Sequence, residues 1–261
     1  MVKDPFAEKT VSDFWISAIV FVCLSAASLG VMYLTPILPQ HHRDEETNTV
    51  VRLVANIFVV MTSLVFGLML NASRSTYEGV DKNVHAYATN MILLDRSLRS
   101  YGLGGKDARL RLRDYVTVAI ADPSRADETF EAMPDRAGKA LDALSDALSV
   151  IEPGNSYHEQ LLLDIKQQYR SLVQQRWVLL EQSEGGVPFP LLGVLVAWLV
   201  VIFASFGYRA PHNKVVVSSF IVASFLISSA FYLVLDMNIP FDGPIQISDQ
   251  PLRRVLAQMD H

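Results

Sequence analysis

Residues 53–73 read LVANIFVVMTSLVFGLMLNAS and contain no Asp, Glu, Lys or Arg. A helix of about 20 apolar residues is long enough to cross the ~30 Å hydrocarbon core of a lipid bilayer. Because that core offers no water to satisfy backbone polar groups, a single segment can cross it only as a helix, which satisfies them internally. The stretch therefore predicts a transmembrane helix, which we place at 53–72.

Three further windows of the chain lack charged residues and hold about 20 apolar residues each. They predict transmembrane helices at 14–38, 187–208 and 215–235. A cleaved signal peptide is the alternative for the first of them. Its apolar stretch is longer than the ~7–15-residue core of a signal peptide, and acidic residues interrupt its positive flank, so we expect a retained anchor. The chain is thus predicted to be a multi-pass membrane protein with four transmembrane helices.

The residues between the second and third predicted spans, 73–186, form a charged insertion. The stretch from Asn71 to Gly186 holds 14 of the chain's 22 Lys and Arg and 17 of its 27 Asp and Glu. With four spans, the N-terminus, this insertion and the tail at 236–261 lie on one side of the membrane. Cations near the span ends favour that side by about two to one, so the positive-inside rule places it in the cytoplasm.

The first part of the insertion carries apolar residues every three or four positions, which is the pattern of one helical stripe. The stripe consists of Val84, Tyr87, Met91, Leu94, Leu98 and Tyr101. Because no proline lies between the second span and Tyr101, we expect the span to continue into the insertion as one long helix. It should break at 102–105, where the sequence reads GLGG.

Three shorter helices are expected to follow, at 107–121, after Pro134-Asp135, and from Ser156. The last begins with Ser156-x-x-Glu159, the pattern of a capping box. The predicted core faces of the last two helices comprise Ala137, Leu141, Leu144, Leu148, Ile151, Leu161, Ile165, Leu172 and Leu179. No window alternates as a strand, so the predicted fold class is an all-α membrane protein with a cytoplasmic helical insertion between its second and third spans. The apolar stripes are explained either by packing within this bundle or by contact with neighbouring subunits, and both can hold together.

The composition excludes several classes of function. The net charge of −5 offers no basic excess with which to neutralise nucleic-acid phosphates. The single cysteine, Cys23, excludes a disulfide framework and a cysteine-based zinc site within one chain. The sequence holds no phosphate-binding glycine loop, no HExxH motif and no nucleophile elbow, so we expect neither enzymatic activity nor a cofactor.

Two stretches of the chain resemble a known family. Residues 62–78 read TSLVFGLMLNASRSTYE, and residues 236–252 read DMNIPFDGPIQISDQPL. Together with the order of two spans, a helical insertion, two spans and a Pro-Phe tail, these stretches resemble the bestrophin-like bacterial membrane proteins, a family largely described as a domain of unknown function. The resemblance runs from about Val50 to the C-terminus. It implies a location in the bacterial inner membrane, with both termini in the cytoplasm.

That family is similar, at a distance, to the bestrophins, which are pentameric anion channels with a narrow hydrophobic neck in the second span. Carried over to this chain, Gly67 matches the glycine of that helix, and Val60, Leu64 and Leu68 match the neck. The tail motif is carried over to Asp236, Pro240, Phe241, Gly243, Asp249, Pro251 and Leu252. The arginine that follows the bestrophin neck is Met69 here, and the tail lacks the dense acidic run that binds calcium in animal bestrophins, so no calcium gating is expected.

The resemblance implies a homo-oligomeric ion channel, with an anion as the conducted ion and a pentamer as its assembly. A ring of apolar side chains can gate by dewetting, because a narrow apolar neck disfavours the water that must accompany an ion. Contact with lipid or with neighbouring helices is the other explanation of Val60, Leu64 and Leu68. A second hypothesis, from another class of function, is a membrane-anchored scaffold or sensor whose cytoplasmic helical bundle binds a partner.

Polar residues within the predicted spans are costly in lipid unless they are hydrogen-bonded. Asn56, Ser63 and Asn71 in the second span are therefore candidates for a wetted path, and the first two lie seven residues apart on one face. Asp236, at the end of the fourth span, is expected either to extend to the membrane surface or to pair with a cation such as Arg74.

One short loop collects residues that bind metals elsewhere. His41, His42, Asp44 and Glu45 offer two imidazoles and two carboxylates between the first two spans, on the side opposite the cytoplasm. Such a group could hold a divalent cation. A solvated turn after Pro39 explains the same residues, and we predict no metal site here.

Overall fold

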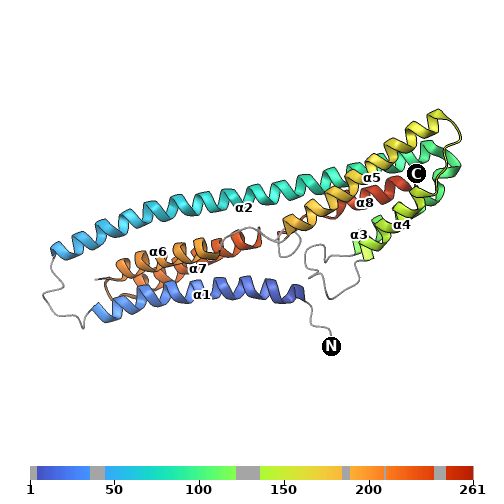
Figure 1. Ribbon diagram of the computed structural model, residues 1–261. Helices are drawn as coiled ribbons and strands as arrows, with labels where there is room; N and C mark the ends of the chain where they lie inside the picture. Colours follow the sequence, from blue (N-terminus) through green and yellow to red (C-terminus); the bar gives the residue numbers. More distant parts are fainter. Residues whose placement is uncertain are drawn as a thin grey trace. The chain divides into compact units, whose positions relative to one another are not determined.

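A computed structural model describes residues 5–35, 45–121, 136–183, 189–208, 210–237 and 245–260. These residues form α1 (Pro5–Leu34), α2 (Glu45–Tyr101), the 3-10 helix η3 (Gly102–Gly105), α3 (Lys106–Ala121), α4 (Arg136–Ser149), α5 (Ser156–Ser183), α6 (Phe189–Gly207), α7 (Lys214–Asp236) and α8 (Gln250–Met259) (Figure 1). No strand occurs within these ranges, which confirms the predicted all-α class.

The chain divides into two compact units. The first unit comprises residues 1–76 and 186–238, and the second unit comprises residues 77–185 and 239–261. The long helix α2 contributes its first part to one unit and its last part to the other. It ends where Gly102, at a φ of 81°, adopts a left-handed conformation that glycine tolerates at no steric cost, as the GLGG sequence predicts.

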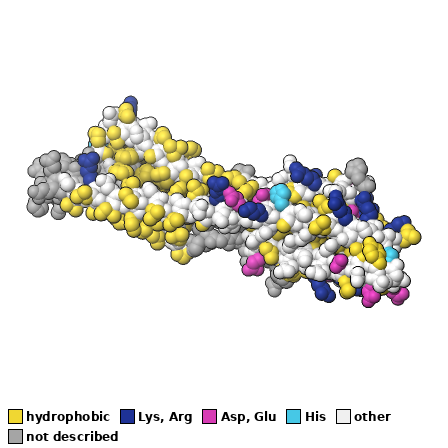
Figure 2. All heavy atoms as spheres, turned by 90° about the horizontal axis from the view of Figure 1, so that it is seen from above, with side chains coloured by type: hydrophobic (Ala, Val, Ile, Leu, Met, Phe, Trp, Pro, Cys, Tyr) yellow, Lys and Arg dark blue, Asp and Glu magenta, His cyan; other side chains and the backbone are white. Residues whose placement is uncertain are grey.

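The first unit is built from the chain's most apolar helices. α1, α2, α6 and α7 are each long and apolar enough to cross a membrane. Hydrophobic side chains cover much of the visible surface of the first unit, whereas charged side chains are frequent on the visible surface of the second unit (Figure 2). A surface of this kind is stable only where lipid or another protein replaces water.

Within the first unit, α1 packs against α6 and α7 around a core that includes Leu24, Leu195 and Phe231. It approaches α6 closely at Gly207, where an added Cβ atom would collide with the carbonyl oxygen of Ser28. Such a contact is possible only without a side chain. Gly207 therefore sets the spacing of these two helices.

Aromatic side chains attach α2 to the rest of the first unit. Phe58 of α2 lies against Trp198 of α6, with ring centroids 6.2 Å apart. Phe66 lies against Phe231 of α7 at 5.4 Å. Such tilted ring pairs add about 0.5–1.5 kcal/mol beyond the area they bury.

The second unit has a separate core formed by α2, α3, α4, α5 and α8. All six residues of the predicted α2 stripe are buried, as are Leu141, Leu144 and Leu148 of α4 and Ile165, Leu172 and Leu179 of α5. Ala137, Ile151 and Leu161 are partly buried against the same core. These stripes therefore pack within the chain's own bundle.

Two amide pairs join α2 to α5 along one seam of the second unit. Asn83 donates to Gln182 at 2.7 Å, and Asn90 donates to Gln175 at 2.8 Å. The donors are seven residues apart and so are the acceptors, in opposite order along the chain. This repeat fits an antiparallel heptad seam, in which polar pairs specify the register of two helices.

The start of α5 differs from the predicted capping box. Asn155 is the capping residue, since its Oδ1 accepts a hydrogen bond from the backbone N–H of His158 at 2.8 Å. Its carbonyl accepts from the N–H of Glu159 at 3.0 Å. The prediction that Ser156 and Glu159 form the box is wrong by one position, because asparagine is at least as good a cap as serine and comes first.

The helices of the first unit extend differently from the predicted spans. α1 begins at Pro5, before the predicted span at 14–38, and α2 begins at Glu45, before the predicted span at 53–72. Charged residues flank the predicted spans and mark the expected edge of the hydrocarbon. Charged residues do not stop a helix, so the helices continue past them.

We predict that Gly207→Ala destabilises the first unit, because the added methyl group collides with the backbone of Ser28. Overpacking of this kind costs about 1–3 kcal/mol. Thermal unfolding of the purified protein, followed by circular dichroism, should show a lower midpoint for this variant. Gly193→Ala on the same helix is the control, since nothing lies within 4 Å of its added Cβ. Equal midpoints for the two variants would contradict the proposed close approach.

Candidate functional site

The predicted neck residues lie on a face of α2 that does not pack against the rest of the chain. Val60 is 69% exposed, Leu64 63% and Leu68 62%. Gly67 lies beside them, and nothing would be within 4 Å of a Cβ atom added to it. The structure thus places all four on an accessible surface of the first unit.

The opposite face of the same part of α2 is buried. Three residues at successive intervals of seven are each 5% exposed or less: Ala55, Thr62 and Met69. At about 100° per residue, Leu64 points about 140–160° away from Thr62 and Met69. α2 therefore uses one narrow stripe to join its own unit and leaves the neck face free for lipid, water or another molecule.

The three polar candidates are also exposed. Ser63 satisfies its hydroxyl by donating to the carbonyl oxygen of Val59 at 2.8 Å. Asn71 lies seven residues after Leu64, so the two side chains share one face of the helix. The side chains of Asn56 and Ser63 are rotated from Leu64 by about 80–100° around the helix axis. The structure therefore joins Asn71 to the neck face and places Asn56 and Ser63 along its flank.

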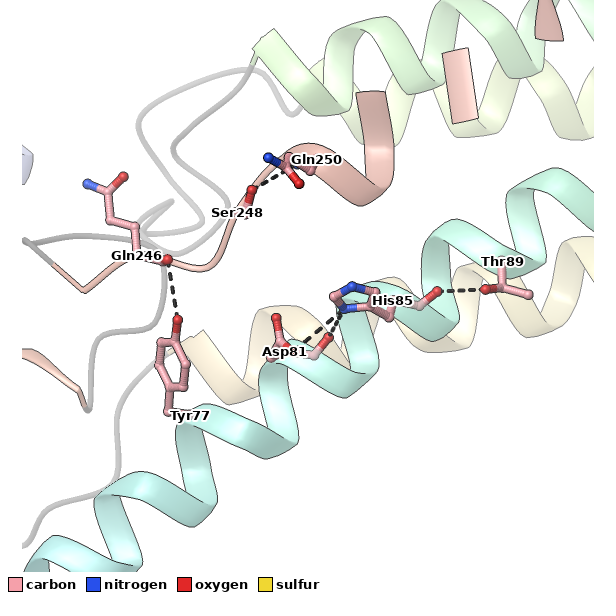
Figure 3. A network of polar contacts seen from close by, with 7 residues as sticks. All are labelled: Tyr77, Asp81, His85, Thr89, Gln246, Ser248 and Gln250. Atoms are coloured by element: carbon pink, nitrogen blue, oxygen red, sulfur yellow. Dashed lines mark hydrogen bonds and ion pairs between the residues drawn. The ribbon is translucent and has the colours of Figure 1, made fainter. Parts of the chain in front are cut away.

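The tail contributes to the second unit, which the sequence reading did not predict. Asp249 is the residue before α8, and Pro251 and Leu252 are buried in the first turn of that helix. The backbone N–H of Gln250 donates to Ser248 Oγ at 3.2 Å, and Tyr77 of α2 donates to the carbonyl of Gln246 at 3.3 Å (Figure 3). Pro240, Phe241 and Gly243 of the tail motif lie outside the described residues.

The sequence of α8 has the apolar spacing of an amphipathic helix. Leu252, Val255, Leu256 and Met259 recur at the i, i+3, i+4, i+7 spacing of an amphipathic helix. Three of these four side chains are buried in the core of the second unit, and Leu256 packs against it. The last part of the tail, from Gln250 to Met259, is therefore a helix docked on the second unit.

Arg109 of α3 fixes the end of α8. Its Nε donates to Oδ1 of Asp95 on α2 at 2.6 Å, and its Nη2 donates to the carbonyl oxygen of Met259 at 2.5 Å. Asp95 is only 3% exposed and also lies 3.6 Å from Nη2 of Arg99. One guanidinium thus neutralises a buried carboxylate and satisfies a carbonyl at the C-terminus of a helix, where a cation is favoured.

Asp236, at the end of α7, is 4% exposed, whereas Arg74 of α2 is exposed. A buried acid at the end of an apolar helix is costly unless it is paired or neutral. The pairing of Asp236 with Arg74 stays a prediction.

The predicted loop with metal-binding residue types lies at the edge of what the structure describes. His41, His42 and Asp44 are outside the described residues, and Glu45 is the first residue of α2, with its side chain undescribed. Elsewhere in the described part of the chain, no group of three His, Cys, Asp or Glu side chains is arranged to hold a metal ion.

One ionisable group in the second unit departs from its ordinary behaviour. Burial raises the pKa of Tyr169, and the nearby carboxylates of Asp142 and Asp146 raise it further, while a hydrogen bond with Ser145 lowers it. The hydroxyl donates to the carbonyl oxygen of Leu141 at 3.1 Å. Tyr169 therefore stays neutral and serves as a link between α5 and α4.

We predict that Arg109→Met destabilises the second unit by about 3 kcal/mol, because it leaves the buried Asp95 without its main partner. A lower midpoint of thermal unfolding, together with faster proteolytic removal of the tail, should report the loss. Arg113→Met is the control, since Arg113 pairs with Asp260 at 2.8 Å between two half-exposed side chains and should cost less than about 1 kcal/mol. Equal effects of the two variants would rule out the bridging role of Arg109.

The predicted pair of Asp236 and Arg74 is tested by exchanging the two charges. Asp236→Arg and Arg74→Asp should each lower the unfolding midpoint, and the double exchange should recover part of the loss if the side chains interact. A double variant no more stable than the worse single variant would exclude the pairing.

Comparison with known proteins places the chain in one family. No protein of curated function and no solved structure matches it. The model of the Bestrophin-like domain family matches residues 22–252, which include α2 through α7 and the first turn of α8. This confirms the resemblance found in the second span and the tail, and the chain belongs to the bestrophin-like family.

Proposed function

We propose that the chain assembles into a homo-oligomeric ion channel, with an anion as the conducted ion and α2 lining the pore. In this arrangement α1, α2, α6 and α7 cross the bacterial inner membrane, and the insertion and both termini lie in the cytoplasm. Membership of the bestrophin-like family supports a membrane-embedded assembly. The pentamer, the anion and the neck come from the similarity of that family to the bestrophins.

The observation that carries the proposal is the free face of α2. Val60, Leu64 and Leu68 point away from the chain's own helices and are among its most exposed large apolar residues. Repeated around a symmetry axis, these side chains would form three stacked apolar rings. A ring of this kind excludes water when it is narrow and admits ions only when it widens or hydrates.

Asn71 favours a pore over lipid for this face. Its side chain is exposed and lies on the same side of the helix as Leu64. An amide facing hydrocarbon has no hydrogen-bonding partner, which is costly, whereas an amide facing a wetted pore or a neighbouring subunit is satisfied. Asn56, also exposed on the flank of that face, supports the same choice.

A scaffold or sensor is the second candidate function, and the second unit favours it through an open groove of about 550 Å3 between α3 and α4. The two functions differ in assembly. Single-particle imaging of the detergent-solubilised protein should show a symmetric ring with a continuous axial path if it is a channel. A monomer or a sealed dimer would favour the scaffold.

Proteoliposomes of the pure protein should release chloride, and Leu64→Ala should increase the flux, because a smaller side chain widens the neck and lowers the cost of hydrating it. Leu70→Ala is the matched control, since Leu70 is 42% exposed on the same helix and lies about 120° from Leu64. Absence of chloride and cation flux from the pure protein, with no change on Leu64→Ala, would reject the channel.

A further inference from the structure

The groove between α3 and α4 lies at the end of the second unit where η3 leads into α3. Its apolar lining comes from Ala143 and Ala147 of α4 and from Val150 and Ile151, which follow that helix. Gly104 of η3 also lines it and contributes no side chain. The result is an open groove of about 550 Å3, whose size suits a few side chains of a partner.

One of the most exposed large apolar side chains of the described residues lines this groove. Val150 is 79% exposed and belongs to the second unit, so the lipid that explains the apolar surface of the first unit does not explain it. An exposed apolar side chain that extends an apolar groove with a charged rim marks a site of interaction.

Charge at the rim selects the kind of partner. Asp107, Asp146 and Glu152 line the groove, against one cation, Arg111. Arg111 Nε lies 3.9 Å from Asp107 Oδ1, and both side chains are at least half exposed, so their ion pair is weak. The groove is therefore acidic over an apolar floor. It repels anionic lipid headgroups and nucleic acid, and it attracts Lys and Arg.

We propose that this groove binds a basic amphipathic segment of a partner protein. Apolar side chains of the segment would pack on Ala147, Val150 and Ile151, and its Lys or Arg side chains would pair with Asp146 and Glu152. This goes beyond ion conduction and supplies a partner class for the second unit, whether or not the chain conducts.

The test uses the full chain in nanodiscs of phosphatidylcholine, a zwitterionic lipid with no net charge, and a fluorescein-labelled amphipathic helical peptide of Lys and Leu. Fluorescence anisotropy should show saturable binding above that of empty nanodiscs. Asp146→Asn and Val150→Ser should each weaken binding about fivefold, the effect of losing about 1 kcal/mol of contact. A peptide with Glu in place of every Lys should not bind.

Matched controls separate the groove from the rest of the surface. Asp142→Asn removes an exposed carboxylate one turn earlier on α4, outside the groove. Leu163→Ser removes a 63% exposed leucine from α5. Both should bind the peptide like the unaltered chain, and all four altered side chains are exposed, so folding is retained.

Three results would overturn the proposal: no saturable binding, equal weakening by the control variants, or equal binding of the Glu peptide. Chloride flux from proteoliposomes of the same variants is a separate measurement, which the groove substitutions should leave unchanged. Failure of this inference and failure of the proposed channel therefore give different results.

Discussion

The division of α2 into faces is the constraint on which the rest of the structure depends. This helix runs without a break for 57 residues from Glu45 to Tyr101, and within each unit its helical period determines which side chains face the core. Its first part packs through a narrow stripe that includes Thr62 and Met69. Its last part packs through a continuous apolar stripe from Val80 to Tyr101. Most of the surface of the first part is therefore left for lipid, water or another copy.

The second unit combines two kinds of interaction with different roles. Its apolar core supplies most of the stability, since each fully buried large side chain contributes about 1.5–3 kcal/mol. A hydrogen-bonded amide pair such as Asn90 and Gln175 contributes about 1 kcal/mol. The amide pairs and the contacts of Arg109 are directional, whereas the apolar contacts are not. The directional contacts therefore determine which register of α2 and α5 is adopted and where α8 ends.

Sequence patterns predicted the helices well where the signal was local. The apolar stripes of α2, α4 and α5 are buried as expected, because apolar residues that recur with the 3.6-residue period lie on one face of a helix, and that face packs on the core. The cap of α5 was misplaced by one residue because Asn155 and Ser156 are both good caps. α8 was not predicted, because a helix of ten residues is marginal on its own and forms through its packing on the core of the second unit.

The sequence by itself determined which segments are apolar helices, where the charged insertion lies and which family the chain resembles, because hydropathy and periodicity belong to each segment alone. Only the tertiary structure decided that Val60, Leu64 and Leu68 face away from the chain's own helices, that Asp95, Arg109 and Met259 meet, and that a groove opens beside Val150. Exposure and contact depend on which elements pack together. The local sequence around residues 95 and 259 does not indicate that these residues meet in the folded chain.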